Sequence, residues 1–274
     1  MSALFRRQIA LPQDHGSWVF IGMPLLIGLF DGGVITTASV ALVIAAMAAF
    51  LIRQPVTMAI KVWSGRRPRT DLPAALFWLA VYGLIAALAA VALIALGAGF
   101  VLFLALPAAP IFAWHLVLVS RRAERRQLWV EVLGTGVLAL VAPAAYWVGI
   151  GRYEPGGWLL WGLVWAQSAA SIGYAYLRLE QREWKTIPDR RARFTAAAGP
   201  VLFAGANLLA AVLLGPIAGL QPAWVFVSFA LQFVETLWGT DHPALGVRPA
   251  AIGTRQLIVS VLFTLLFIVA LRIG

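Results

Sequence analysis

Long apolar runs separated by short polar breaks make up most of the chain after residue 15. Several runs reach about 20 residues, the length that a helix needs to cross a hydrocarbon core ~30 Å thick. The breaks carry glycine, proline and charged residues, which end helices. The pattern therefore predicts nine membrane-spanning helices, over residues 16–30, 34–52, 73–95, 100–119, 128–148, 158–178, 196–214, 223–239 and 256–272.

The composition favours the same fold class. Hydrophobic residues make up 62% of the chain and charged residues 12%, whereas a soluble domain carries about 25% charged residues. No polar stretch is long enough for a separate soluble domain, so we expect one all-α transmembrane domain over residues 1–274. The first apolar run leads directly into the second and has no small-residue cleavage site, so it does not resemble a signal peptide. The lack of cysteine excludes disulfides and cysteine-ligated metals.

Basic residues fall almost entirely on one side of the predicted membrane. Nineteen of the 21 Lys and Arg residues lie at the N-terminus or in the loops after spans 2, 4, 6 and 8, and the exceptions are Arg152 and Arg272. The positive-inside rule then predicts a bacterial inner-membrane protein with a cytoplasmic N-terminus and an outside C-terminus. Topology and attraction to anionic lipid account for the net charge of +10, so we do not expect a nucleic-acid-binding protein.

The two longest basic loops resemble each other. One ends with Arg66-Arg67-Pro68-Arg69 and the other with Arg190-Arg191-Ala192-Arg193, and the first arginines are 124 residues apart. His115 and His242 recur at a similar offset. This spacing indicates a parallel repeat that pairs spans 2–5 with spans 6–9. The alternative is that arginine pairs recur by chance in loops that are all basic.

Polar side chains within or beside the spans are functional candidates because a charge at the centre of a bilayer costs at least ~2.5–3.5 kcal/mol. Most lie toward the basic side, which predicts one polar chamber that opens to the cytoplasm. His15 and Glu131 are the candidate general acid and base. Arginine forks suit phosphate or carboxylate recognition. The candidate residues for binding an anionic ligand are Arg53, Gln54, Arg66, Arg67, Arg178, Glu180, Arg182, Glu183 and Asn207.

Each candidate also has a structural interpretation. Glu131 begins a span, where the helix dipole favours a carboxylate and where Arg125 or Arg126 could pair with it. Asp14 could cap the first span. The arginines could serve only as positive-inside determinants and lipid contacts. Three histidines on one side, His15, His115 and His242, could hold a metal or a haem, but no characteristic spacing supports this, so we predict no metal site.

The stretch Leu11-Pro12-Gln13-Asp14-His15-Gly16-Ser17-Trp18, followed by Pro24 and Gly28, resembles the opening of YwiC-like membrane proteins. The resemblance extends along most of the chain through the topology and the basic loops. It supplies little chemistry, because the family itself implies no reaction.

The chain has a more distant similarity to UbiA-type intramembrane prenyltransferases. That similarity implies nine spans, an inside N-terminus and a cavity capped by the 2–3 and 6–7 loops, in which two Asp-rich motifs hold Mg²⁺ on a diphosphate. Here the end of the second span reads Arg53-Gln54-Pro55, and no carboxylate follows until Asp71. Only Glu180 and Glu183 remain at the other site. Because Mg²⁺ prefers carboxylate oxygens, we do not expect the standard two-site Mg²⁺ mechanism.

These features predict a protein that binds an amphipathic ligand with an anionic head, such as an isoprenoid, a quinone or a phospholipid. The protein would be a divergent transferase of the UbiA type or a binding protein without the metal chemistry. The alternatives are a non-catalytic subunit of a membrane complex and a transporter. Copurification at fixed stoichiometry would support the former, and polar features near the midplane would support the latter.

Overall fold

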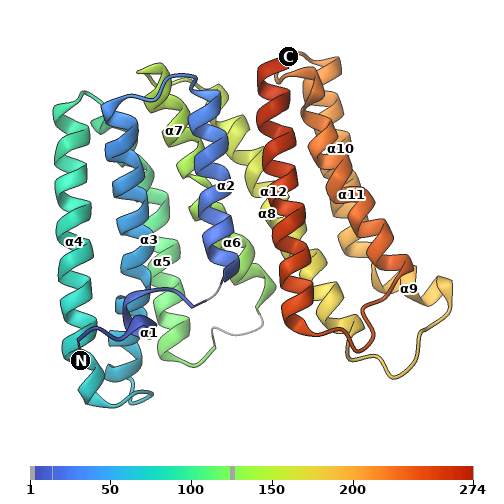
Figure 1. Cartoon of the computed structure of the whole chain (residues 1–274), viewed down its shortest axis with the longest axis horizontal. Coiled ribbons are helices and arrows are strands. Elements are labelled where there is room, and N and C mark those ends of the chain that lie inside the picture. Colours follow the sequence, from blue (N-terminus) through green and yellow to red (C-terminus); the bar gives the residue numbers. More distant parts are fainter. Residues whose placement is uncertain (1–3, 14, 124–126, 274) are drawn as a thin grey trace. The chain divides into compact units, whose positions relative to one another are not determined.

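The computed structural model describes residues 4–13, 15–123 and 127–273, apart from the side chain of His15. Throughout this part of the chain every regular element is helical, which confirms the all-α prediction (Figure 1). The chain forms two compact units, Met1–Trp158 and Leu159–Gly274, which we call unit 1 and unit 2.

Unit 1 begins with a short N-terminal segment that contains one helical turn, followed by a bundle of longer helices. The longest, α3, carries a capping box in which Thr36 and Ser39 satisfy each other's backbone amides. The elements are α1 (Arg7–Ala10), α2 (His15–Asp31), α3 (Thr37–Trp63), the 3₁₀ turn η1 (Arg69–Asp71), α4 (Leu72–Ala95), the 3₁₀ turn η2 (Gly99–Leu104), α5 (Ala105–Ser120), α6 (Leu128–Ala139) and α7 (Val141–Ile150).

Unit 2 contains four long helices and several short turns. Helix α10 passes into a π turn that contains Pro216, whose ring cannot continue the α-helical hydrogen bonding. The elements are α8 (Gly156–Gln181), which begins at the end of unit 1, α9 (Arg190–Ala196), α10 (Ala198–Val212), the π turn η3 (Leu213–Ile217), the 3₁₀ turn η4 (Ala223–Val225), α11 (Phe226–Asp241) and α12 (Pro249–Ile273).

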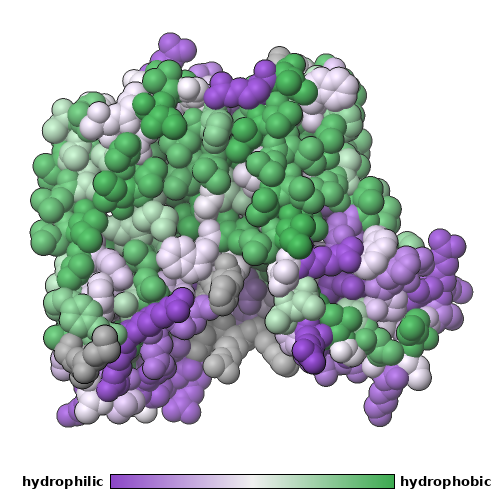
Figure 2. Space-filling view, in the orientation of Figure 1, coloured by the Kyte–Doolittle hydropathy of each residue, from purple (hydrophilic) through white to green (hydrophobic). Residues whose placement is uncertain are grey.

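Six helical segments within the described ranges are long and apolar enough to cross a membrane. They are Thr37–Trp63, Arg69–Ala95, Gly99–Ser120, Leu128–Ile150, Ala198–Ile217 and Pro249–Ile273. The apolar helix over Gly16–Asp31 is shorter, and α8 and α11 are not among the six. These three helices correspond to predicted spans 1, 6 and 8, so nine spans remain a prediction. In each unit, hydrophobic side chains cover the long sides of the helices on the visible face (Figure 2).

Small residues bring α2 and α7 into backbone contact. A Cβ atom on Gly28 would lie 2.2 Å from the carbonyl oxygen of Ala142, and one on Gly149 would lie 2.7 Å from the Cα of Gly32. Glycines four residues apart on one helix face allow such close approach between apolar helices. This contact holds α2 against α7. It therefore also helps to position the stretch Leu11–Trp18, which leads into α2.

Candidate functional site

The N-terminal segment is attached to α3 and α4 through its main chain. Three side chains of these helices donate hydrogen bonds to carbonyl oxygens of the segment, so its position does not depend on its own side chains alone. The pairs are Trp78 Nε1 with Leu4 O at 2.9 Å, Gln54 Nε2 with Gln8 O at 2.7 Å, and Tyr82 OH with Ala10 O at 3.2 Å.

An ion pair and a buried side chain complete the attachment. The carboxylate of Asp71, only 3% exposed, accepts from Arg6 at 2.7 Å and from Arg67 at 3.2 Å. Ile9, 1% exposed, packs in an apolar cluster with residues of α3 and α4 that include Met58 and Ala75. The same segment is therefore held by apolar, hydrogen-bonding and ionic contacts.

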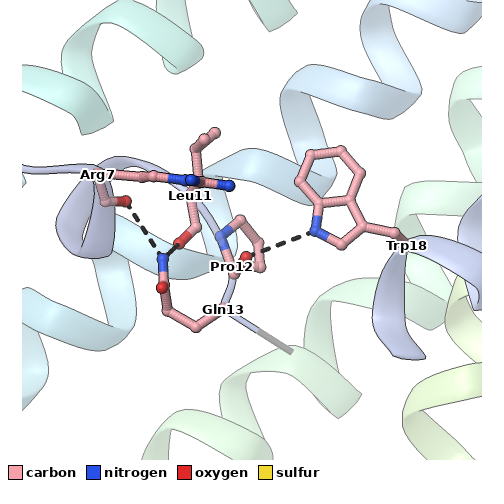
Figure 3. Close-up of a pocket in the computed structure, with 5 residues that line it drawn as sticks. All are labelled: Arg7, Leu11, Pro12, Gln13 and Trp18. Atoms are coloured by element: carbon pink, nitrogen blue, oxygen red, sulfur yellow. Dashed lines mark hydrogen bonds between the residues drawn. The ribbon is translucent and has the colours of Figure 1, made fainter. Parts of the chain in front are cut away.

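A small pocket opens where this segment turns into α2 (Figure 3). Its volume is about 130 Å³. Gln13 folds back and donates to Leu11 O at 2.9 Å, and the indole of Trp18 donates to Pro12 O at 3.4 Å. Arg7 and Leu11 also line the pocket (Figure 3). Arg7 forms no ion pair with any residue that the structure describes.

Apart from Arg7, the residues that line the pocket belong to the stretch Leu11–Trp18, which resembles the opening of YwiC-like proteins. A match to a known protein family begins in the same stretch. Residues 11–146 match the family model of YwiC-like proteins. No curated protein and no solved structure matches the chain. The YwiC-like match and the apolar helices together indicate a multi-pass membrane protein.

The YwiC-like region lies wholly within unit 1 and begins at the pocket. His15, a candidate acid or base, starts α2 two residues after Gln13, which lines the pocket. Its side chain, and all of Asp14, lie outside the described part of the chain. Arg125 and Arg126, proposed partners of Glu131, lie outside it too. Glu131 itself is exposed in the first turn of α6.

The candidate anion-binding residues of unit 1 lie in protein contacts near the ends of α3 and α5. Gln54 is buried beneath the N-terminal segment. Arg66 donates to the carbonyl oxygen of Val119, and Arg67 pairs with Asp71. The guanidinium carbon of Arg53 lies 5.5 Å from the centre of the Phe50 ring. The pocket is lined by Arg7 instead of by these arginines.

Arg178 is the most deeply placed candidate of unit 2, at 6% exposure. Its Nη1 donates to Gly239 O and His242 O, each at 2.6 Å, and to Gln181 Oε1 at 2.8 Å. Arg178 therefore supplies positive charge at the C-terminal end of α11, where a helix favours a cation. Gln181 adds a second bond to Gly239 O at 3.2 Å.

The other candidates of unit 2 are more peripheral. Glu180 is exposed, and Arg182 pairs with the exposed Glu183 at 3.1 Å. Asn207 of α10 donates to Ala166 O at 3.0 Å, which joins α10 to the middle of α8. Within the described residues, no group of three or more His, Asp or Glu side chains is arranged to hold a metal ion.

The shortest ion pair described in unit 2 involves residues that were not among the predicted ligands. Arg255 donates to both carboxylate oxygens of Glu235, at 2.6 and 2.7 Å, and Tyr174 donates to Oε1 at 2.9 Å. The guanidinium of Arg255 also lies 3.6 Å from the centre of the Trp238 ring. The signal that could have found this cluster is the acid at the inner end of span 8, but its partners lie on other helices.

Proposed function

We propose that this chain is a multi-pass protein of the bacterial inner membrane, with a cytoplasmic N-terminus and an outside C-terminus, that binds the anionic head of an amphipathic lipid. The apolar helices and the YwiC-like match support the membrane location. The placement of nineteen of the 21 Lys and Arg residues on one predicted side supports the orientation.

The pocket at Arg7 carries this proposal. It combines a cation that pairs with no described carboxylate, the amide of Gln13, and the indole of Trp18, a residue type enriched at membrane interfaces. A volume of about 130 Å³ suits a phosphate or carboxylate group but not a whole lipid. The tail of the ligand would therefore lie outside the pocket, along apolar surface.

The remaining candidates keep subsidiary roles in the proposal. Arg53, Arg66, Arg67 and Arg178 would add positive potential at the basic ends of their units, which attracts anionic ligands before they bind. If the protein is a divergent prenyltransferase-like enzyme, His15 and Glu131 would be its acid and base. That finer proposal rests on the position of His15 in the chain, two residues after Gln13, and on the exposure of Glu131.

Native mass spectrometry in mild detergent tests the proposal with three probes: phosphatidylglycerol, an isoprenyl phosphate and a ubiquinone. We expect at least one anionic probe to bind the wild type, and Arg7→Ala to weaken it roughly tenfold or more, because a hydrogen bond to a charged group contributes about 1.5–3 kcal/mol. Arg69→Ala is the control: it removes an exposed arginine of the same unit outside the pocket. Equal loss in both variants, or binding of none of the probes, contradicts the proposal.

A further inference from the structure

A second and larger pocket lies in unit 1, where the ends of three helices meet. Its volume is about 300 Å³, more than twice that of the pocket at Arg7. Its walls come from the start of α3, from the end of α4 with the following turn η2, and from the end of α7. These helix ends lie together at the top of unit 1 (Figure 1). The lining residues include Thr37, Leu96, Phe100 and Val148.

Two glycines in the left-handed conformation shape this pocket. Helix α4 is followed by Gly97, with φ at 76°, and α7 by Gly151, with φ at 73°, and both glycines line the pocket. After Gly97, the amide of Ala98 donates to Leu93 O at 2.8 Å. This is the Schellman pattern, which turns the chain away from the end of a helix. The pocket is therefore bounded in part by backbone whose conformation the glycines define.

The start of α3 supplies hydrogen-bond donors. Its capping box uses the amides of Thr36 and Ser39. The amides of Thr37 and Ala38 belong to the first turn, so they have no partner within the helix. The hydroxyl of Thr37, an exposed residue, makes no hydrogen bond with the described residues. Thr37 and Ala38 both line the pocket, and their donors suit an oxygen atom of a ligand.

The walls of the pocket suit an uncharged ligand. Among the described residues that line it, none carries a charged side chain. The amino end of α3 meets the carboxyl ends of α4 and α7 there, and the dipoles at these ends have opposite signs, so they do not add up to a field that attracts an anion. An ion in the pocket would lose hydration without gaining a charged partner.

Apolar surface leads away from the pocket along α4. Leu96 is 47% exposed, and Ile94 and Val91 before it are 61% and 63% exposed. Helix α4 belongs to a segment that is long and apolar enough to cross a membrane, so lipid would reach these side chains. The volume lies at the lower end of the range of about 300–1,000 Å³ for small-molecule sites. It suits the head of a lipid, with the tail outside.

We propose that this pocket binds the uncharged head of a neutral lipid, whose oxygen atom accepts a hydrogen bond from Thr37 and whose tail lies along α4. The cavity and its uncharged walls carry the proposal. An isoprenoid quinone and a diacylglycerol share this chemistry. From Thr36 to Gln54, which lies beneath the N-terminal segment, α3 runs for about 27 Å. The site is therefore separate from the pocket at Arg7 and does not depend on anion binding there.

Titrations followed by native mass spectrometry test the site with two neutral probes, a short-tailed ubiquinone and dioctanoylglycerol, which distinguish the two sources of the head group. Thr37→Trp fills the pocket from an exposed position. Thr70→Trp is the matched control, because it makes the same change at an exposed threonine of η1 outside the pocket. Thr37→Val removes the hydroxyl group and keeps the size of the side chain.

We expect at least one neutral probe to bind the wild type, Thr37→Trp to weaken its binding about tenfold or more through a steric clash, and Thr70→Trp to leave it unchanged. Thr37→Val should weaken binding about two- to tenfold, the range for one neutral hydrogen bond. Binding of neither probe, binding that survives Thr37→Trp, or equal loss in both tryptophan variants overturns the proposal. If Thr37→Trp does not fold, unchanged binding by Thr37→Val overturns it. Binding of phosphatidylglycerol, measured separately, reports on the pocket at Arg7 alone.

Discussion

Glu235 of α11 and Arg255 of α12 form a two-point ion pair, with N–O distances of 2.6 and 2.7 Å. The glutamate side chain is 9% exposed and the arginine side chain 41%. Removing the arginine would leave a largely buried carboxylate with only the Tyr174 hydroxyl as donor. The pair therefore links α11 and α12, the last two long helices of unit 2. Its loss should lower the free energy of unfolding.

We expect Arg255→Ala to destabilise the protein by about 1.5–3 kcal/mol, the usual range for hydrogen bonds to charged groups, since the exposed arginine end limits the effect. Unfolding in mixed detergent micelles measures the change. A double-mutant cycle with Glu235→Gln isolates the pair. A coupling energy near zero would show that the two residues contribute independently.

Gly239 is a second point at which unit 2 tolerates little change. A Cβ atom there would lie 2.0 Å from the hydroxyl oxygen of Tyr174, whose side chain is fully buried. We expect Gly239→Ala to cost about 1–3 kcal/mol through overpacking, read from the same unfolding experiment. Gly253→Ala on α12 is the control, because its Cβ would meet no atom within 4 Å. That substitution should be neutral or stabilising, since alanine is the better helix former.

The contact between α2 and α7 gives a matched prediction in unit 1. Gly28→Ala would push a methyl group against the backbone carbonyl of Ala142, which cannot rotate away as a side chain can. We expect a loss of about 3 kcal/mol or more, at the upper end of overpacking effects. Gly22→Ala, on the same helix with nothing within 4 Å, should be nearly silent. Similar thermal stability of the two variants would contradict the close contact.

Asp71 should control how firmly the N-terminal segment is held. Asp71→Asn weakens the bonds to Arg6 and Arg67 at a carboxylate that is 3% exposed, so we expect faster amide exchange over residues 6–11. Hydrogen exchange with mass spectrometry reports this locally. Glu183→Gln removes an ion pair whose carboxylate is 72% exposed, and it should leave exchange and stability within about 0.5 kcal/mol of wild type. Unchanged exchange over residues 6–11 would mean that the other contacts suffice.

The sequence predicted the helices well because apolar length is a local property. The predicted spans 73–95 and 128–148 lie on α4 and on the combined segment of α6 and α7. It also drew attention to Leu11–Trp18, where the structure has a pocket. Arg7 was missed as a ligand candidate because nothing in its neighbourhood along the chain shows that Leu11 and Trp18 fold back toward it.

Partner choice between helices was the part that the sequence did not reveal. Gln54 was a candidate for binding an anion, and in the structure its amide holds the carbonyl of Gln8, 46 residues away. The spacing of Gln167, Ser171, Tyr174 and Arg178 was readable as a single helix face, but the acceptors at Gln232 and Gln256 come from register between helices. Register depends on packing, as at Gly239, and packing is not encoded locally.

The attachment of the N-terminal segment has a consequence for tolerance to substitution. Trp78, Gln54 and Tyr82 recognise peptide carbonyls, which every amino acid provides in the same place. Gln8, whose side chain is exposed, can therefore vary without losing its bond, whereas Leu4 and Ala10 also pack in the interior and the three donors cannot be exchanged freely. The position of the N-terminal segment is thus set in part by side chains of α3 and α4 that bind its backbone.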